Sequence, residues 1–194
     1  MAHSHAAIGR PSQWVSRFAP LIPQGEVLDL ACGAGRHAKL LAALGHAVLA
    51  VDRDEEALGR AAGEGITTLR IDLERDGDRP ASWPFIPGRF AGVVVTNYLH
   101  RPLFVEIMSS LMPGGALIYE TFAEGNQQFG KPSNPDFLLR TGELLHAAQA
   151  ARPHPLRVVA YEDGYISQPA PAMVQRICAV KPSDGREPGM LRLN

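Results

Sequence analysis

Short apolar runs alternate with stretches of helical periodicity along most of the chain. This alternation is typical of an α/β protein, because apolar strands pair into a sheet and amphipathic helices cover its faces. The apolar runs predict strands at residues 27–31, 47–51, 66–71, 90–96, 116–121, 156–161 and 173–180. The periodic stretches predict helices at residues 11–18, 36–44, 55–62, 103–111 and 141–150.

The order of these segments indicates the kind of sheet. Residues 91–95 are almost continuously apolar, which suits a central strand covered on both faces. The last two strands follow each other with no helix between them, so we expect an antiparallel pair at one edge. The sequence therefore predicts a doubly wound, Rossmann-like, seven-stranded and mostly parallel sheet with an antiparallel C-terminal edge pair.

The 194 residues suit one domain, which we place at residues 11–181. Residues 1–10 and 182–194 are expected to be disordered ends. We expect residues 74–89 to form a loop in which Trp83-Pro84-Phe85 plugs an edge of the core. Residues 123–137 are polar and rich in glycine and proline, and we interpret them as a lid-like insertion over the site.

The composition and net charge limit the kinds of partner that we expect. The formal net charge of −1 lacks the basic excess typical of nucleic-acid binding, so no nucleic-acid partner is expected. No run approaches the ~20 apolar residues of a membrane span, and the start lacks a secretory signal, so we expect a cytoplasmic location. Neither the two cysteines nor the histidines are spaced like the ligands of a metal site, so no metal is expected. A monomer or homodimer is expected.

The segment with the clearest chemical meaning runs from Asp29 to Gly35, between the first strand and the first long helix. Glycines there let the backbone approach a ligand, because they lack Cβ and accept positive φ. The helix that begins near Arg36 offers free N–H groups. Such a loop suits the carboxylate and ammonium of an amino-acid ligand, with Asp29 receiving the ammonium. The alternative role for Asp29 is a turn-capping carboxylate.

A second acidic residue, Asp52, ends the second strand nineteen positions after Gly33. A carboxylate at this place can accept hydrogen bonds from both hydroxyls of a ribose. The alternative role is the N-cap of the next helix, since aspartate is a preferred cap. The loop also fits the dinucleotide pattern GxGxxA, which alone is a weak signal.

With these residues in place, the run VLDLACGAGRHAKLLAALGHAVLAVDRD resembles the first two motifs of class I S-adenosylmethionine-dependent methyltransferases. The later run LMPGGAL is similar to their turn before the fifth strand. The GR after the loop, the Gly142-Glu143-Leu144 segment and the C-terminal strand pair resemble the tellurite-resistance subgroup.

The resemblance implies that the cofactor is S-adenosyl-L-methionine and that the loop from Asp29 through Gly33 and Gly35 binds it. It implies ribose recognition by Asp52, and adenine recognition by Asp72 with Leu73. The first glycine of the usual loop is Ala31 here, which we expect to be tolerated with a negative φ.

Residues after the fourth strand should face the reacting methyl group, because ligands lie beyond the carboxyl ends of strands in this fold. Asn97 is a candidate to hold the cofactor or the acceptor, and Tyr98 to pack on the sulfonium. His100 is a candidate general base, with helix capping or packing as the equal alternative. Tyr119 is a second candidate to take a proton from an oxygen or amine acceptor.

We therefore expect methyl transfer to a small-molecule acceptor, with a soft oxyanion or thiol-like nucleophile as one option. A non-catalytic S-adenosylmethionine-binding module is the first alternative. An NAD(P)-dependent oxidoreductase is the second, permitted by the GxGxxA match but lacking the Tyr-x-x-x-Lys pair of the short-chain type.

Overall fold

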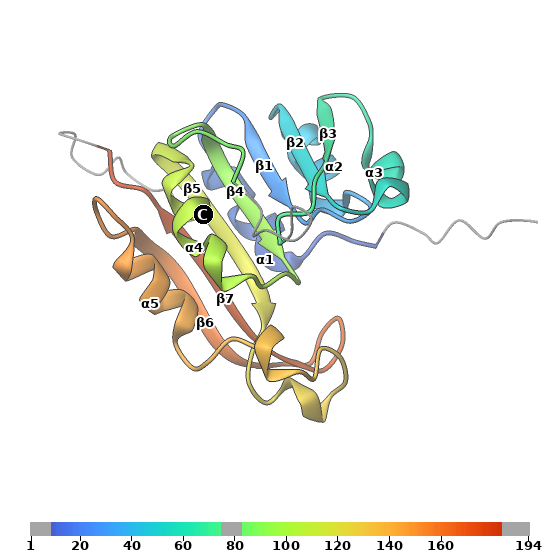
Figure 1. The fold of residues 1–194 in the computed structure, drawn as a ribbon, viewed down its shortest axis with the longest axis vertical. Helices are drawn as coiled ribbons and strands as arrows, with labels where there is room; N and C mark the ends of the chain where they lie inside the picture. The colour runs from blue at the N-terminus through green and yellow to red at the C-terminus, as the bar shows by residue number, and fades with distance from the viewer. Residues whose placement is uncertain (1–8, 75–82, 184–194) are drawn as a thin grey trace, which may run out of the picture.

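The computed structural model describes residues 9–74 and 83–183, and its centre is a 7-stranded sheet in the order β3-β2-β1-β4-β5-β7-β6 (Figure 1). The strands are β1 (Val27–Leu30), β2 (Val48–Asp52), β3 (Ile66–Arg70), β4 (Phe90–Thr96), β5 (Leu111–Phe122), β6 (Arg157–Ile166) and β7 (Ala172–Val180).

Strands β1 to β5 pair in parallel, whereas β7 lies antiparallel to both β5 and β6. The predicted sheet, including its antiparallel edge pair, is therefore confirmed. β4 is buried along its whole length, as its apolar sequence predicts. Because the carboxyl ends of parallel strands meet at one edge of a sheet, Asp52 and Thr96 are brought to the same side.

Helices cover both faces of the sheet (Figure 1). The α-helices are α1 (Gln13–Phe18), α2 (Arg36–Ala43), α3 (Glu55–Ala61), α4 (Phe104–Ser109) and α5 (Glu143–Ala150), and the 3-10 helices are η1 (Ala19–Leu21), η2 (Arg101–Leu103), η3 (Asn126–Gln128) and η4 (Pro135–Phe137). One core layer takes Trp14, Leu41 and Leu58 from α1, α2 and α3. The other takes Ile107 and Leu144 from α4 and α5. The fold is thus doubly wound.

Two elements differ from expectation around the fourth helix and the fifth strand. The helix expected at 103–111 is shorter: α4 runs from Phe104 to Ser109 and follows directly on the 3-10 turn η2, which contains Pro102. β5 begins at Leu111 rather than 116 and so includes Pro113-Gly114-Gly115. A Cβ at Gly115 would lie 3.0 Å from the carbonyl oxygen of Phe90, so only glycine lets β5 run this close to β4 there.

The aromatic plug expected near the fourth strand is present. Trp83, Phe85 and Phe90 pack edge to face in sequence, with ring centroids 5.0 and 5.3 Å apart. Phe85 is buried, and Trp83 packs against the same core layer. The rest of this expected loop, residues 75–82, lies outside the described residues, as do most of the expected disordered ends, 1–10 and 182–194.

The insertion at 123–137 lies beside the turn between β6 and β7 (Figure 1). Its anchor is Asn126, which is 1% exposed, donates to the Pro132 carbonyl and accepts from the Met173 N–H. The Arg101 guanidinium holds its far end by donating to the carbonyls of Asp136 and Leu138. Within the part of the chain that the structure describes, no helix is long and apolar enough to cross a bilayer.

Candidate functional site

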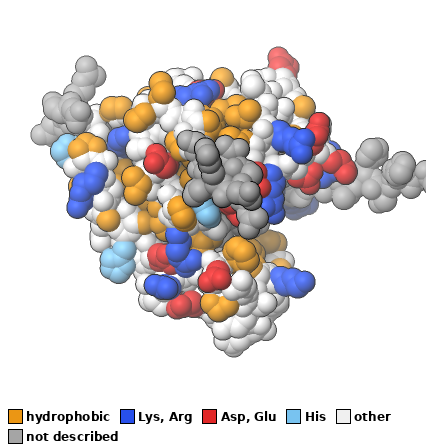
Figure 2. Space-filling view, in the orientation of Figure 1, with side chains coloured by type: hydrophobic (Ala, Val, Ile, Leu, Met, Phe, Trp, Pro, Cys, Tyr) orange, Lys and Arg blue, Asp and Glu red, His pale blue; other side chains and the backbone are white. Residues whose placement is uncertain are grey.

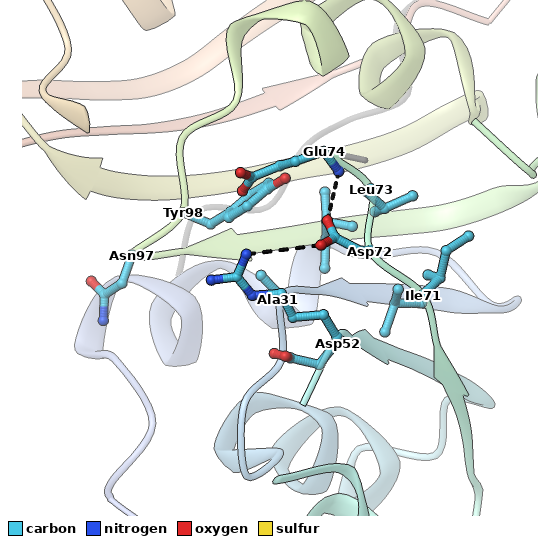
Figure 3. A pocket seen from close by; sticks show the side chains of 11 residues that line it. Ala31, Asp52, Ile71, Asp72, Leu73, Glu74, Asn97 and Tyr98 are labelled. Atoms are coloured by element: carbon cyan, nitrogen blue, oxygen red, sulfur yellow. Dashed lines mark hydrogen bonds and ion pairs between the residues drawn. The ribbon is translucent and has the colours of Figure 1, made fainter. Parts of the chain in front are cut away.

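A pocket of about 270 Å³ opens at the carboxyl ends of the parallel strands (Figure 3). It is formed by the ends of β1, β2 and β3, and by the segment that follows β4. Its lining residues are Leu30, Ala31, Val51, Asp52, Arg53, Ile71, Asp72, Leu73, Glu74, Asn97 and Tyr98. The structure thus brings together six of the residues that the sequence nominates, namely Ala31, Asp52, Asp72, Leu73, Asn97 and Tyr98.

Asp52, the last residue of β2, is held by two backbone donors. The N–H of Gly33 donates to its Oδ2 at 2.8 Å, and the N–H of Asp54 donates to its Oδ1 at 3.0 Å. A carboxylate oxygen has two acceptor positions, so each still has one for a ligand hydroxyl. The N-cap of α3 is Asp54, which accepts from the N–H groups of Glu56 and Ala57. The alternative capping role for Asp52 is therefore wrong.

Asp72 follows β3 and lines the same pocket as Asp52 (Figure 3). Its Oδ1 accepts from the N–H of Glu74 at 2.9 Å, and its Oδ2 lies 4.0 Å from the guanidinium of Arg53. Leu73 beside it is 7% exposed and gives the pocket an apolar wall continuous with the core. A carboxylate next to an apolar surface suits a ligand that has a flat apolar face and an N–H edge.

The glycine loop uses left-handed backbone at three positions, Ala31 (φ 54), Gly33 (φ 53) and Gly35 (φ 76). The expectation that Ala31 keeps a negative φ is wrong, because the loop needs the same turn here that glycine supplies in the usual motif. A Cβ at Gly35 would lie 2.6 Å from the Cβ of Ala61, so this glycine lets α2 pack on α3. A Cβ at Gly33 would meet nothing within 4 Å, so this backbone faces open space.

Asp29 is placed differently from the other acidic residues. It is 1% exposed, does not line the pocket, and its Oδ2 accepts from the N–H of Ala38 at 2.8 Å in the first turn of α2. Burial raises the pKa of its carboxyl from 3.8 to about 7, against the lowering effects of the Ala38 bond and Arg36. The geometry is that of a carboxylate capping the helix from within.

Asn97 and Tyr98 follow β4 directly. Asn97 has φ 55, a conformation that asparagine tolerates better than most residues, and its N–H donates to the Glu120 carbonyl. Figure 3 shows the Tyr98 ring beside the carboxylate of Glu74. Burial, followed by the charges of Glu74 and Asp72, raises the pKa of the Tyr98 hydroxyl, so it stays protonated at neutral pH.

The two candidate proton acceptors, Tyr119 and His100, lie outside the pocket lining. Tyr119 is 1% exposed and its hydroxyl donates to the Tyr98 carbonyl at 2.9 Å. Burial raises the pKa of Tyr119, so its hydroxyl stays protonated at neutral pH and cannot accept a proton from a substrate. Its geometry is that of a residue that positions Tyr98. His100 is half-buried before η2 and makes no side-chain capping bond there.

Sequence reasoning missed Arg53 and Glu74 as pocket residues. Each directly follows a segment already nominated, Asp52 and Asp72-Leu73, so the strand ends were a usable signal. Among the described residues, no group of three or more His, Cys, Asp or Glu side chains could hold a metal ion.

The sequence and the fold are both similar to those of known methyltransferases. The family described as a methyltransferase domain matches residues 27–115. Protein-L-isoaspartate O-methyltransferase from Chlorobaculum tepidum is 34% identical over 108 residues, which are 55% of this chain and 49% of that protein. The chain thus spans about half the length of the curated relative it matches.

Solved structures share the fold at low identity. A SAM-dependent methyltransferase from Methanosarcina mazei has a TM-score of 0.66 at 14% identity, covering 91% of this chain and 100% of that one. TehB from Haemophilus influenzae has a TM-score of 0.68 at 18% identity, covering 86% of this chain and 61% of that one. Residues 27–115 are thus similar to a methyltransferase domain, and the sheet built around them shares the Rossmann-like fold of the solved methyltransferases.

Proposed function

We propose that this chain transfers the methyl group of S-adenosylmethionine to a small-molecule acceptor. The observation that carries the proposal is that Asp52 and Asp72 face one pocket from the ends of neighbouring parallel strands. Asp52 would accept from the ribose hydroxyls, and Asp72 from the exocyclic amine of adenine. Leu73 and the Ala31 methyl offer apolar contact for the adenine ring.

The amino-acid end of the cofactor would lie along the glycine loop. Gly33 exposes its backbone to open space, so a ligand can approach it closely. Asp29 lies beneath this loop and would interact with the ammonium through its other carboxylate oxygen, with Asn97 as a further contact.

The bound cofactor supplies a methyl group that its sulfonium already activates, so the protein needs mainly to align the acceptor. Tyr98 stands at the pocket beside the expected methyl position and can contact the cationic sulfur through its ring. Its hydroxyl, and that of Tyr119, stay protonated at neutral pH because burial raises both pKa values. Neither phenol is therefore a useful base.

The protonated state of both phenols favours an acceptor that reacts without losing a proton to the enzyme, such as a soft oxyanion or a thiolate. The resemblance to the tellurite-resistance methyltransferases and the fold shared with TehB point the same way. The charge pattern favours a small acceptor over a nucleic acid, because Lys and Arg are interspersed with Asp and Glu on the face drawn in Figure 2. A cytoplasmic location and a monomeric or homodimeric state stay predictions.

The test is transfer of a labelled methyl group from S-adenosylmethionine to a panel of acceptors: tellurite, selenite, a small thiol, a phenol and an amine. We expect transfer to the soft acceptors, and His100→Gln should leave it unchanged. Transfer only to the phenol or amine, abolished in His100→Gln, would replace the soft-acceptor proposal with general-base catalysis. Tight cofactor binding with no label transferred to these acceptors or to cell extract would indicate the non-catalytic binding module instead.

A further inference from the structure

Ser12 lies just before α1. It bonds the N-terminal segment, here residues 9–12, to two other parts of the fold. Its N–H donates to Nε2 of His37 in the first turn of α2, at 3.1 Å. Its hydroxyl donates to Oε1 of Glu120 near the end of β5, at 2.8 Å, and accepts from the N–H of Trp14 at 3.1 Å. One residue therefore caps α1 and ties it to both α2 and β5.

His37 carries this connection onward to β4. It is 1% exposed, and because Nε2 accepts from Ser12, its proton is placed on Nδ1, which lies 3.3 Å from the hydroxyl of Thr96. Burial lowers the pKa of the imidazole from 6.5 to about 3, so the ring stays neutral and keeps its acceptor. Thr96 ends β4, directly before Asn97 of the pocket.

The far side of α1 is fixed as well. The second carboxylate oxygen of Glu120 lies 3.3 Å from the guanidinium of Arg176, which itself lies 4.9 Å from the centroid of a Trp14 ring. The indole N–H of Trp14 donates to the Ile177 carbonyl at 3.3 Å. Ser12 and Trp14 thus hold the start of α1 against β5 and β7, and His37 links Ser12 to the end of β4 (Figure 1).

These contacts lie on the side of the glycine loop opposite the nucleoside pocket. The pocket residues Asp52 and Asp72 stand at β2 and β3, whereas the Ser12 contacts stand at β4, β5 and the start of α2. A ligand whose nucleoside fills the pocket and whose chain follows the loop past Gly33 extends toward His37, two residues beyond Gly35. The Ser12 N–H donates to this same histidine, so such a chain would approach the segment before α1.

We infer that Ser12 and His37 form a clasp that positions the N-terminal segment as the wall around the amino-acid end of the cofactor. The clasp rests on the proposed function, since it presumes that the nucleoside of S-adenosylmethionine occupies the pocket. Ser12 and His37 are positioning residues: neither lines the pocket, and both act through the segment that they hold. The clasp should therefore affect binding of the amino-acid chain and leave binding of the nucleoside unchanged.

Two ligands separate these effects: S-adenosylhomocysteine, and 5′-methylthioadenosine, which has the same nucleoside thioether without the amino acid. Both would be titrated calorimetrically into the full chain and into Ser12→Ala, His37→Ala and His37→Gln. Ser16→Ala is the matched control. It removes the same hydroxyl one turn later in α1, and the Ser16 hydroxyl donates only to the Ser12 carbonyl. Thermal unfolding of each variant confirms that it is folded before titration.

We expect Ser12→Ala and His37→Ala to weaken S-adenosylhomocysteine about fivefold or more, the worth of about one hydrogen bond, and methylthioadenosine less than about twofold. His37→Gln, which restores an acceptor for the Ser12 N–H, should recover part of the loss. Equal weakening of both ligands, or no weakening of either, would overturn the clasp while leaving the proposed function in place. Failure of the wild-type chain to bind either ligand would overturn the proposed function and the clasp with it.

Discussion

The backbone N–H of Gly33 donates to the carboxylate of Asp52 at 2.8 Å, so the glycine loop after β1 is fastened to the end of β2. This bond aims the carboxylate and fixes the loop at the same time. A ligand that bonds to Asp52 therefore meets a group already oriented by the protein, which lowers the entropic cost of binding. The two residues are nineteen positions apart in the sequence, and the parallel pairing of β1 with β2 brings them together.

Ala31 provides a test of the strained loop. Its φ of 54 costs an L-residue about 1–2 kcal/mol, whereas glycine loses about 0.4–1 kcal/mol through the greater freedom of the unfolded chain. We expect Ala31→Gly to raise the free energy of unfolding by about 0.5–1 kcal/mol in urea denaturation. Ala34→Gly, in the same loop but without a positive φ, should lower it. Destabilisation by both substitutions to a similar extent would contradict the backbone conformation of Ala31.

Replacing Gly33 and Gly35 by alanine should have different effects on stability and on cofactor binding. At Gly35 the added Cβ meets Ala61 at 2.6 Å, so we expect a loss of about 2–4 kcal/mol of stability from overpacking and strain together. At Gly33 the Cβ meets nothing, so only the backbone strain of about 1–2 kcal/mol should appear. Gly33→Ala should instead weaken S-adenosylhomocysteine in calorimetric titration. Equal losses of stability in the two variants would argue against this division.

The buried carboxyl of Asp29 predicts a dependence of stability on pH. Its pKa is about 7 in the folded chain and near 3.8 when unfolded, so the folded state favours the protonated form. The contribution of the protonated Asp29 carboxyl to the free energy of unfolding is fully present below pH 4 and is lost as the pH rises through 7. The loss amounts to up to about 4 kcal/mol. Asp29→Asn should therefore gain stability over the wild type at pH 8 and lose that advantage toward pH 4. Parallel urea-unfolding profiles for the two proteins across this range would refute the shift.

The same carboxyl should make cofactor binding sensitive to pH. An ammonium held near Asp29 favours the ionised form, so binding would release a proton wherever Asp29 is protonated in the free protein. We expect the affinity for S-adenosylhomocysteine to rise between pH 5 and about 7, and to be flatter in Asp29→Asn. Calorimetry in buffers of different ionisation enthalpy measures the released proton directly. No proton release at pH 6 would remove Asp29 from the ammonium site.

The sheet could be predicted from the sequence because each buried strand is a short apolar run with polar ends. β4 shows this most plainly, since its predicted bounds and its observed bounds, Phe90–Thr96, coincide. Asp52 could be nominated for the same reason, because it ends such a run, whereas Asp72 was nominated through the resemblance to the methyltransferase motifs. The conformation of a single loop residue carries no such periodic signal, and for this reason the φ of Ala31 was mispredicted.

The contacts around Ser12 could not be predicted for a different reason. Ser12 lies 25 residues from His37 and 108 from Glu120, and only the packing of α1 on the completed sheet brings them together. The burial of Tyr119 is likewise decided by tertiary packing, because the Phe104 ring of α4 packs edge to face on its ring and its hydroxyl donates to the Tyr98 carbonyl. Residue type alone cannot distinguish such a core tyrosine from a catalytic one.

The most direct measurement is calorimetric titration of S-adenosylhomocysteine into the wild-type chain, Asp52→Ala and Asp54→Ala. The two variants make the same change two residues apart, but Asp52 lines the pocket whereas Asp54 caps α3 away from it. We expect the wild type and Asp54→Ala to bind alike, and Asp52→Ala to bind at least about tenfold more weakly, which corresponds to about 1.4 kcal/mol. Unchanged affinity in Asp52→Ala, or a wild-type chain that does not bind the nucleoside, would contradict the assignment of this pocket.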